Sequence, residues 1–386
     1  MRTVARVFTA GTPSNRLFRF ALGVLAGAMI LAVARNLVLS FPTGVDLEIP
    51  LRAAERWLHG GEPYVASSFQ VESGPGLPYL YPPFLLPLLA PLTSAPRSLV
   101  LAAWCAVCGL SALATLRRLA VPWRYVPGFL LWPPFLEGIL GGNVQILLFA
   151  AFVFAFWAQS SAQPAERPFA RLAGSGFAPA WRAGLAASIG LLKITQVHAW
   201  LLALRANPRN ALLAASVFAA LVASTLPLTG FSIYLGWLHQ LQRASDPAWI
   251  PGGPGIGRVL PSLLVAPVVL ASALATFKVP RGTAATWTGV LLIVGSPSLH
   301  SFGWLFLLPA LLTVRAEIAL IAVLCLASYG VALYWLAFVL VVGCLALGHR
   351  WPAFLEHPRL VRSDRLRTTS RGGGLDTTAV HVASRR

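Results

Sequence analysis

The chain has 386 residues, of which 57% are hydrophobic and only 11% carry a charge, and its formal net charge is +18. Its mean hydropathy of +0.71 excludes a water-soluble protein and predicts roughly ten to twelve transmembrane helices at about 20 residues each. The arginines lie in short clusters between apolar runs, which excludes a nucleic-acid-binding face. Because an open sheet cannot exist in hydrocarbon, we expect an all-α polytopic membrane protein.

Basic residues flank the apolar part of the chain at both ends. Residues 1–19 contain arginines and no acid, and residues 349–386 form an arginine-rich tail that we expect to be disordered. Positively charged ends stay on the cytoplasmic side, so both termini are predicted to be cytoplasmic and residues 20–348 to form the integral membrane domain. Scarce lysine beside abundant arginine, alanine and glycine indicates a GC-rich bacterial genome, and hence a bacterial plasma membrane.

The first outer loop, residues 41–81, follows the first predicted span and is rich in acids. Within it, residues 50–59 predict an amphipathic helix that starts at Pro50 and lies along the membrane surface. Asp46 precedes this helix, and its carboxylate is either functional, or it simply caps the helix or pairs with Arg52. Five of the twelve acidic residues of the chain occur in this loop, which indicates the chemical end of an enzyme: Asp46, Glu48, Glu55, Glu62 and Glu72.

The proline-rich stretch 78–96 decides the topology of the middle of the chain. The basic residues require residues 79–116 to cross the membrane once, whereas a full span at 79–95 would reverse the section that follows. With one crossing, residues 125–141 run from the cytoplasmic to the outer face and residues 144–160 return to the cytoplasmic face. This path places Asn143 at an outer turn. Asn143 and Gln145 are then either ligands of sugar hydroxyls or simply a turn and a helix start.

Lys193 is one of only two lysines and lies within an apolar segment, residues 182–205. A single span would bury its ammonium at the centre of the bilayer, where an unpaired charge is expensive. We therefore predict a hairpin of two short helices with Lys193 at the outer turn. A lysine in such a place suits a phosphate or a carboxylate partner.

The last third of the chain predicts alternating spans and loops. Spans at 211–229 and 259–277 enclose a second outer loop, 230–258, which we expect to be a flexible interfacial loop or, alternatively, a lid over the acceptor. The chain then rises to His300, descends through 301–314, and ends in the stretch 317–348, which splits at Gly330 into a hairpin. His300 contacts either a phosphate or sugar group or only the backbone.

Four helix breaks open to one membrane face on this path: those with Asp46, Asn143, Lys193 and His300. This convergence predicts one site at the outer surface. The four cysteines lie in apolar segments and predict neither a disulfide framework nor a metal site. The sequence indicates no cofactor.

A set of ordered motifs resembles glycosyltransferase family 87, the polyprenol-phosphate-dependent mannosyltransferases of the GT-C superfamily. The chain departs from the family pattern in having Gly142-Asn143 where Gly-Gln more often precedes Asn, and Ile194 where proline often follows the lysine. The resemblance covers about residues 44–309 and rests on Gly44-Val-Asp46-Leu-Glu48, residues 52–64, Tyr79-Leu-Tyr81-Pro82-Pro83, Gly142-Asn143-Val-Gln145, Gly190-Leu-Leu-Lys193, and Ser296-Pro297 with His300.

This resemblance implies a GT-C-type bundle in which a hexose, mannose first, passes with inversion from a polyprenyl phosphate to a lipid or glycan hydroxyl at the outer face. Asp46 matches the general base, and Lys193, His300 and Arg258 are expected to bind the donor phosphate. The predicted sugar or acceptor contacts are Glu48, Arg52, Tyr81, Asn143, Gln145 and His239. The alternatives are a transporter or flippase of lipid-linked sugars and a non-catalytic assembly factor.

Overall fold

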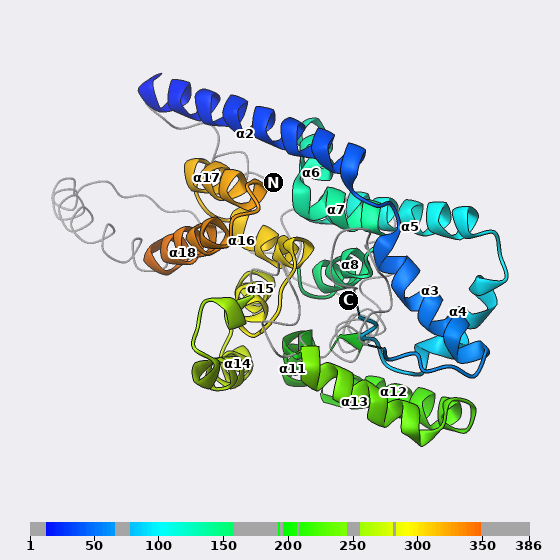
Figure 1. Ribbon diagram of the computed structural model, residues 1–386. Helices are drawn as coiled ribbons and strands as arrows, with labels where there is room; N and C mark the ends of the chain where they lie inside the picture. The colour runs from blue at the N-terminus through cyan, green and yellow to red at the C-terminus, as the bar shows by residue number, and fades with distance from the viewer. Residues whose placement is uncertain are drawn as a thin grey trace, which may run out of the picture. The chain divides into compact units, whose positions relative to one another are not determined.

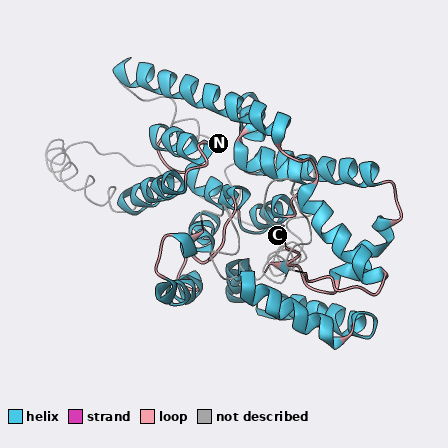
Figure 2. Cartoon of the chain, viewed as in Figure 1, coloured by secondary structure: helices cyan, strands magenta, loops and turns pink. Residues whose placement is uncertain are grey.

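The computed structural model describes residues 13–65, 78–157, 192–193, 196–206, 208–244, 255–280 and 283–348. Over these residues the chain forms helices joined by turns and loops, without a strand (Figure 2). Three helical stretches there are long and apolar enough to cross a membrane, at 16–58, 97–118 and 211–229, and shorter apolar helices accompany them. The all-α polytopic prediction is confirmed. Both basic ends of the chain lie largely outside the described residues.

Helix α2 (Pro13–Ser40) is the first span, and it turns into α3 (Val45–Leu58) through Gly44. Gly44 has a φ of +78°, which favours glycine, and its N–H donates to the carbonyl of Leu140 at 2.7 Å. The predicted start of the amphipathic helix at Pro50 was wrong, because Gly44 makes the turn and Pro50 lies inside the helix. Pro50 has no N–H to offer the carbonyl of Asp46.

The proline-rich stretch after the first loop does not cross the membrane. Helix α4 (Leu85–Thr93) has nine residues, and at 1.5 Å per residue it is about 14 Å long, half the thickness of the hydrocarbon core. It packs against α3 instead (Figure 1). Helix α5 (Arg97–Arg118), with 22 residues, is long enough to cross. This agrees with the single crossing of residues 79–116 that the basic residues required.

The rising segment predicted at 125–141 is divided into η1 (Trp123–Tyr125), α6 (Val126–Leu131) and α7 (Pro133–Gly141). The break falls at Trp132, whose ψ of 130° is extended, because Pro133 excludes the helical conformation for the residue before it. Helix α7 ends at Gly142, with φ +68°, and α8 (Gln145–Phe156) follows. The turn expected around Asn143 is therefore present.

Helices α11 (Val197–Ala206) and α12 (Pro208–Thr229) precede the segment predicted as a second outer loop. The expectation of a flexible loop was wrong for α13 (Phe231–Ala244), because these residues form a helix. Its residues Tyr234 and Gln240 are buried, and Trp237 is half-buried, so one face packs inward at helical spacing. Residues 245–254 of the predicted loop lie outside the described residues, and η3 (Ile256–Arg258) follows them.

The last helices follow the predicted order. They are α14 (Ser262–Thr276), α15 (Ala284–Val294), η5 (Ser301–Leu307), α16 (Leu308–Leu311), α17 (Ala316–Ala327) and α18 (Val331–Gly348). The predicted split of 317–348 at Gly330 is confirmed, because Gly330 lies between α17 and α18. Tyr329, beside it, has a φ of +56°, which few residues other than glycine adopt.

The main core lies where α5, α7, α8, α15 and η5 meet, and aromatic residues fill much of it. Phe149 and Phe306 meet edge to face with ring centroids 5.4 Å apart, and both are fully buried. A side chain at Gly289 would collide with the carbonyl of Phe306, so glycine lets α15 approach η5. This core fixes the α7–α8 turn relative to the chain around His300.

Helix α2 runs beside α17 and α7 (Figure 1). Many of its large apolar side chains are exposed, as expected of a helix that faces lipid: Leu17, Phe20, Leu25, Leu31 and Leu39. One ion pair ties it to α17, because Nε of Arg19 lies 2.8 Å from Oε1 of Glu317. Both side chains are mostly buried.

Candidate functional site

Asp46 lies in the first turn of α3 with its carboxylate against the end of α7. A Cβ at Gly141 would lie only 2.6 Å from Oδ2 of Asp46, so glycine at 141 leaves room for the carboxylate. Burial raises the pKa of Asp46 to about 6, although a hydrogen bond from Asn143 and the charge of Lys193 lower it. An acid with a pKa of this size is ionised at pH 7 and has a substantial proton affinity, which suits a general base.

Asn143 places this carboxylate relative to α8. Its Oδ1 accepts the backbone N–H of Gln145 at 2.8 Å, which leaves its amide N–H groups to donate to Asp46. The side chain is buried. Asn143 therefore starts α8, in agreement with one of the two interpretations drawn from the sequence, and it also holds Asp46.

Gln145 connects this turn to the chain before α11. Its Oε1 accepts hydrogen bonds from Nζ of Lys193 at 2.8 Å and from Nε2 of Gln196 at 2.6 Å. Two donors on one atom fix the orientation of the amide. The other amide atoms, Nε2 of Gln145 and Oε1 of Gln196, are buried without a partner among the described residues. Gln196 was not singled out from the sequence.

Lys193 lies just before α11, outside the spanning helices, as the sequence predicted. The first helix of the expected hairpin lies outside the described residues. Burial lowers the pKa of Lys193 to about 8, and the negative charge of Asp46 opposes this shift. Its Nζ lies 5.8 Å from the centroid of the Phe302 ring. No ion pair within 4 Å joins Lys193 to Asp46, so the two charges are near each other and remain separate.

His300 is half-buried and its ring stacks on Phe302, with centroids 5.4 Å apart. Its pKa is lowered to about 4 by burial and then by the positive charges of Lys193 and Arg258. The imidazole is therefore neutral at pH 7 and can donate one hydrogen bond, but it brings no charge.

Arg258 is exposed at the end of η3, near enough for its charge to act on His300. The segment before it packs on the turn that leads to His300, because the N–H of Gly257 donates to the carbonyl of Pro297 at 3.0 Å. A side chain at Gly255 would collide with the same carbonyl. Glycine at 255 thus allows two loops, distant in sequence, to bring Arg258 and His300 together.

Tyr81 lies near Asp46. The pKa of Tyr81 is raised, first by burial and then by the negative charge of Asp46, so the two side chains are neighbours. Its carbonyl accepts the hydroxyl of Tyr64 at 2.7 Å, and the indole of Trp237 donates to the carbonyl of Leu80 at 3.0 Å. Helix α13 thereby packs over the chain that carries Tyr81.

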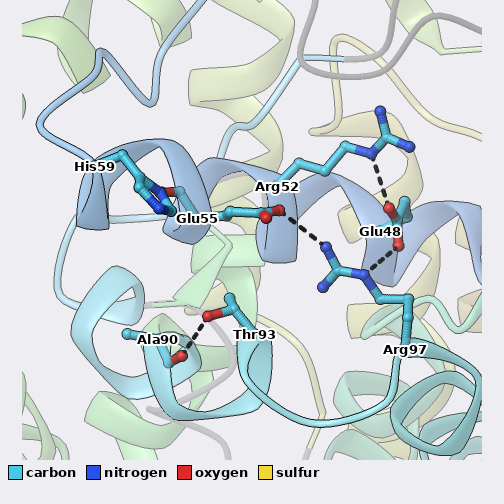
Figure 3. Close-up of polar contacts among 7 residues, drawn as sticks. All are labelled: Glu48, Arg52, Glu55, His59, Ala90, Thr93 and Arg97. Atoms are coloured by element: carbon cyan, nitrogen blue, oxygen red, sulfur yellow. Dashed lines mark hydrogen bonds and ion pairs between the residues drawn. The ribbon is translucent and has the colours of Figure 1, made fainter.

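Three predicted contact residues lie elsewhere. Glu48 pairs with Arg52 at 2.8 Å and with Arg97 at 3.2 Å, and Arg97 also reaches Glu55 at 3.2 Å (Figure 3). This network joins α3 to the start of α5 and does not include Asp46. The pairing of Arg52 with Asp46 that the sequence offered as an alternative is not among the ion pairs of the described residues, and Arg52 pairs with Glu48 instead. His239 is exposed on α13.

Glu137 belongs to this region and was missed in the sequence. It lies on α7, accepts hydrogen bonds from the hydroxyls of Ser301 and Tyr329, and lies close enough to Asp46 for the two charges to interact. A usable signal existed, because Glu137 is the only acid in the predicted span 125–141, and an acid within a membrane segment is usually functional.

The site therefore combines a carboxylate, a separate ammonium, a neutral imidazole and several amides. Among the described residues, no group of three or more His, Cys, Asp and Glu side chains is close enough to hold a metal ion. Such a set can take a proton from a hydroxyl and stabilise negative charge nearby.

A sequence model of glycosyltransferase family 87 matches residues 79–299, more than half of the chain. The matched region includes Asn143, Gln145 and Lys193, and it begins after Asp46 and ends just before His300. No curated protein and no solved structure gives a significant match.

Proposed function

Because the chain belongs to glycosyltransferase family 87 and is a membrane glycosyltransferase, we propose that it transfers a hexose, mannose first, from a polyprenyl phosphate. The acceptor is a hydroxyl of a lipid or a glycan at the outer membrane face, and the transfer inverts the anomeric centre.

One observation carries this proposal: hydrogen bonds through Asn143 and Gln145 connect Asp46 to Lys193, and no ion pair within 4 Å joins the two charges. In an ion pair they would neutralise each other, whereas separate charges can serve different parts of a reaction. A carboxylate with a raised pKa suits an acceptor hydroxyl, and a half-buried ammonium suits a phosphate.

The proposed reaction is a single displacement. Asp46 takes the proton of the acceptor hydroxyl as its oxygen attacks the anomeric carbon, and the bond between that carbon and the phosphate oxygen breaks. Polyprenyl phosphate leaves with the bonding electrons, and Lys193 and Arg258 balance its added negative charge. The neutral ring of His300 donates one hydrogen bond to the phosphate, and the protonated Asp46 returns its proton to water.

The leaving group explains why one carboxylate suffices. A phosphate monoester is already a good leaving group and needs stabilisation of charge rather than a proton. The lipid donor also fits the surroundings, because helices such as α2 expose large apolar side chains to the bilayer.

The test is to incubate detergent-solubilised membranes that contain the protein with labelled polyprenyl-phosphate-mannose and to follow the label. We expect loss of the donor and a new glycosylated product. A flippase would leave the donor chemically unchanged, because it only moves lipids from one side of a membrane to the other. In detergent there are no two sides, so a flippase would give no signal. Transfer from a nucleotide sugar, with none from the lipid-linked sugar, would overturn the proposed donor class.

A further inference from the structure

A second carboxylate faces the region of Asp46. Glu137 lies one helical turn before Gly141 on α7, and residues four apart share a helix face. Gly141 is the residue against which Asp46 packs, and the charge of Asp46 acts on Glu137. The two acids therefore border the same region of the structure.

The contacts of Glu137 use only one of its oxygens. Oε2 accepts the hydroxyl of Ser301 and, at 3.2 Å, the hydroxyl of Tyr329. Oε1 accepts no hydrogen bond from the described residues, and the side chain is only half-buried. A carboxylate held by two donors on one oxygen keeps the lone pairs of the other oxygen available to a ligand.

The residues that hold Glu137 are themselves constrained. Ser301 directly follows His300, so its bond to Glu137 ties the predicted phosphate-binding end of η5 to α7. Tyr329 has a φ of +56°, an unfavourable conformation for a residue with a side chain. Such strain persists only where surrounding contacts impose it, and here the tyrosine hydroxyl reaches Glu137.

Tyr334, on α18, carries a further polar group. Tyr334 is 1% exposed, and its hydroxyl has no hydrogen-bond partner among the described residues. The charge of Glu137 acts on this tyrosine. A buried hydroxyl without a partner is costly, so a bound hydroxyl or water that meets it would stabilise the site.

We propose that Glu137 binds a hydroxyl of the transferred hexose through Oε1, while Ser301 and Tyr329 hold the carboxylate in place. This inference rests on the proposed function. It places the sugar between Asp46 and Glu137, with its phosphate toward Lys193 and His300. A carboxylate that accepts a sugar hydroxyl also selects among sugars, because it favours donors that carry that hydroxyl in the correct position.

The experiment compares Glu137→Gln with the wild-type protein on polyprenyl-phosphate-mannose and on analogues that each lack one sugar hydroxyl. We expect kcat/KM for the intact donor to fall about 10- to 100-fold, the range for one hydrogen bond to a charged group. For the analogue that lacks the bound hydroxyl, the variant and the wild type should be nearly equal. A merely structural role predicts the same loss on every donor, and that result would overturn the inference.

Glu137→Gln removes a carboxylate from a polar network, so its folding is checked by thermal unfolding in detergent. If it does not fold, Tyr329→Phe is put through the same comparison, because it loosens Glu137 without removing it. A hydroxyl-specific loss supports the inference, and a uniform loss contradicts it. If the wild type uses none of these donors, the proposed function is wrong. If the wild type uses the intact donor and the variant loses activity equally on every donor, only the inference about Glu137 is wrong.

Discussion

Nζ of Lys193 lies 2.8 Å from Oε1 of Gln145, although 48 residues separate them in the chain. This bond joins the turn after α7, which holds Asp46 through Asn143, to the chain that leads into α11. The proposed base and the proposed phosphate-binding cation are therefore placed relative to each other through two side-chain amides, those of Asn143 and Gln145.

Asp46→Asn should abolish transfer and leave donor binding largely intact. The amide has the shape of the carboxylate but cannot take the proton of the acceptor, and removal of a general base costs about 10² to 10⁴ in rate. The measurement is product formation from labelled donor, together with binding of unlabelled donor to the purified protein. Full activity of this variant would exclude Asp46 from the mechanism.

Gly141→Ala should lower kcat strongly without unfolding the protein. The new methyl group would lie 2.6 Å from Oδ2 of Asp46 and would push the carboxylate aside, and a shift of about 1 Å costs about 100-fold. Gly128→Ala is the matched control, because a Cβ there meets nothing within 4 Å. Equal activity of the two variants would show that the position of Asp46 does not matter.

Lys193→Gln should weaken use of the donor. Loss of a charge-assisted contact to the phosphate is expected to lower kcat/KM for the donor about 10- to 100-fold. The only other lysine, Lys278, is exposed on the surface, so Lys278→Gln is the control and should behave as the wild type. A similar loss in both variants would argue for a general effect of charge instead.

The dependence of kcat/KM on pH should be bell-shaped. Asp46 has a pKa of about 6, so activity should rise through that pH as the base ionises. Lys193 has a pKa of about 8, so activity should fall above it as the ammonium loses its proton. Lys193→Arg should move the alkaline limb to higher pH, since arginine keeps its charge there. An unchanged alkaline limb would mean that another group causes it.

Glu48→Gln should affect stability more than activity. Its carboxylate joins Arg52 to Arg97, and exposed or partly exposed ion pairs contribute about 0.2 to 1 kcal/mol each. We expect a small decrease in the melting temperature and unchanged kcat/KM. A tenfold loss of activity at unchanged stability would restore the sequence prediction that Glu48 contacts the substrate.

The sequence predicted the parts of the fold that depend on local chemistry. Glycine, proline and isolated polar residues mark helix ends within apolar runs, and the breaks at Gly142, Lys193 and Gly330 were found in this way. The gathering of Asp46, Asn143, Lys193 and His300 followed because basic residues set the direction of each crossing.

Other features depend on contacts between distant segments and had no local signal. Helix α3 starts at Val45 because Gly44 bonds to Leu140, far along the chain. Glu48 forms an ion pair with Arg97, and Gln196 donates a hydrogen bond to Gln145, and both partners are distant in the chain. Helix α13 is a different case, because its inward residues Tyr234, Trp237 and Gln240 repeat at helical spacing, which is a local signal.

The ion pair between Arg19 and Glu317 has a consequence for biosynthesis. Helix α2 leaves the ribosome long before α17, so Arg19 enters the edge of the bilayer while its counter-charge has not yet been translated. Lipid phosphates or water must accompany the guanidinium during that interval. The ion pair that ties the first helix in place can thus form only after a helix near the other end of the membrane domain has been added.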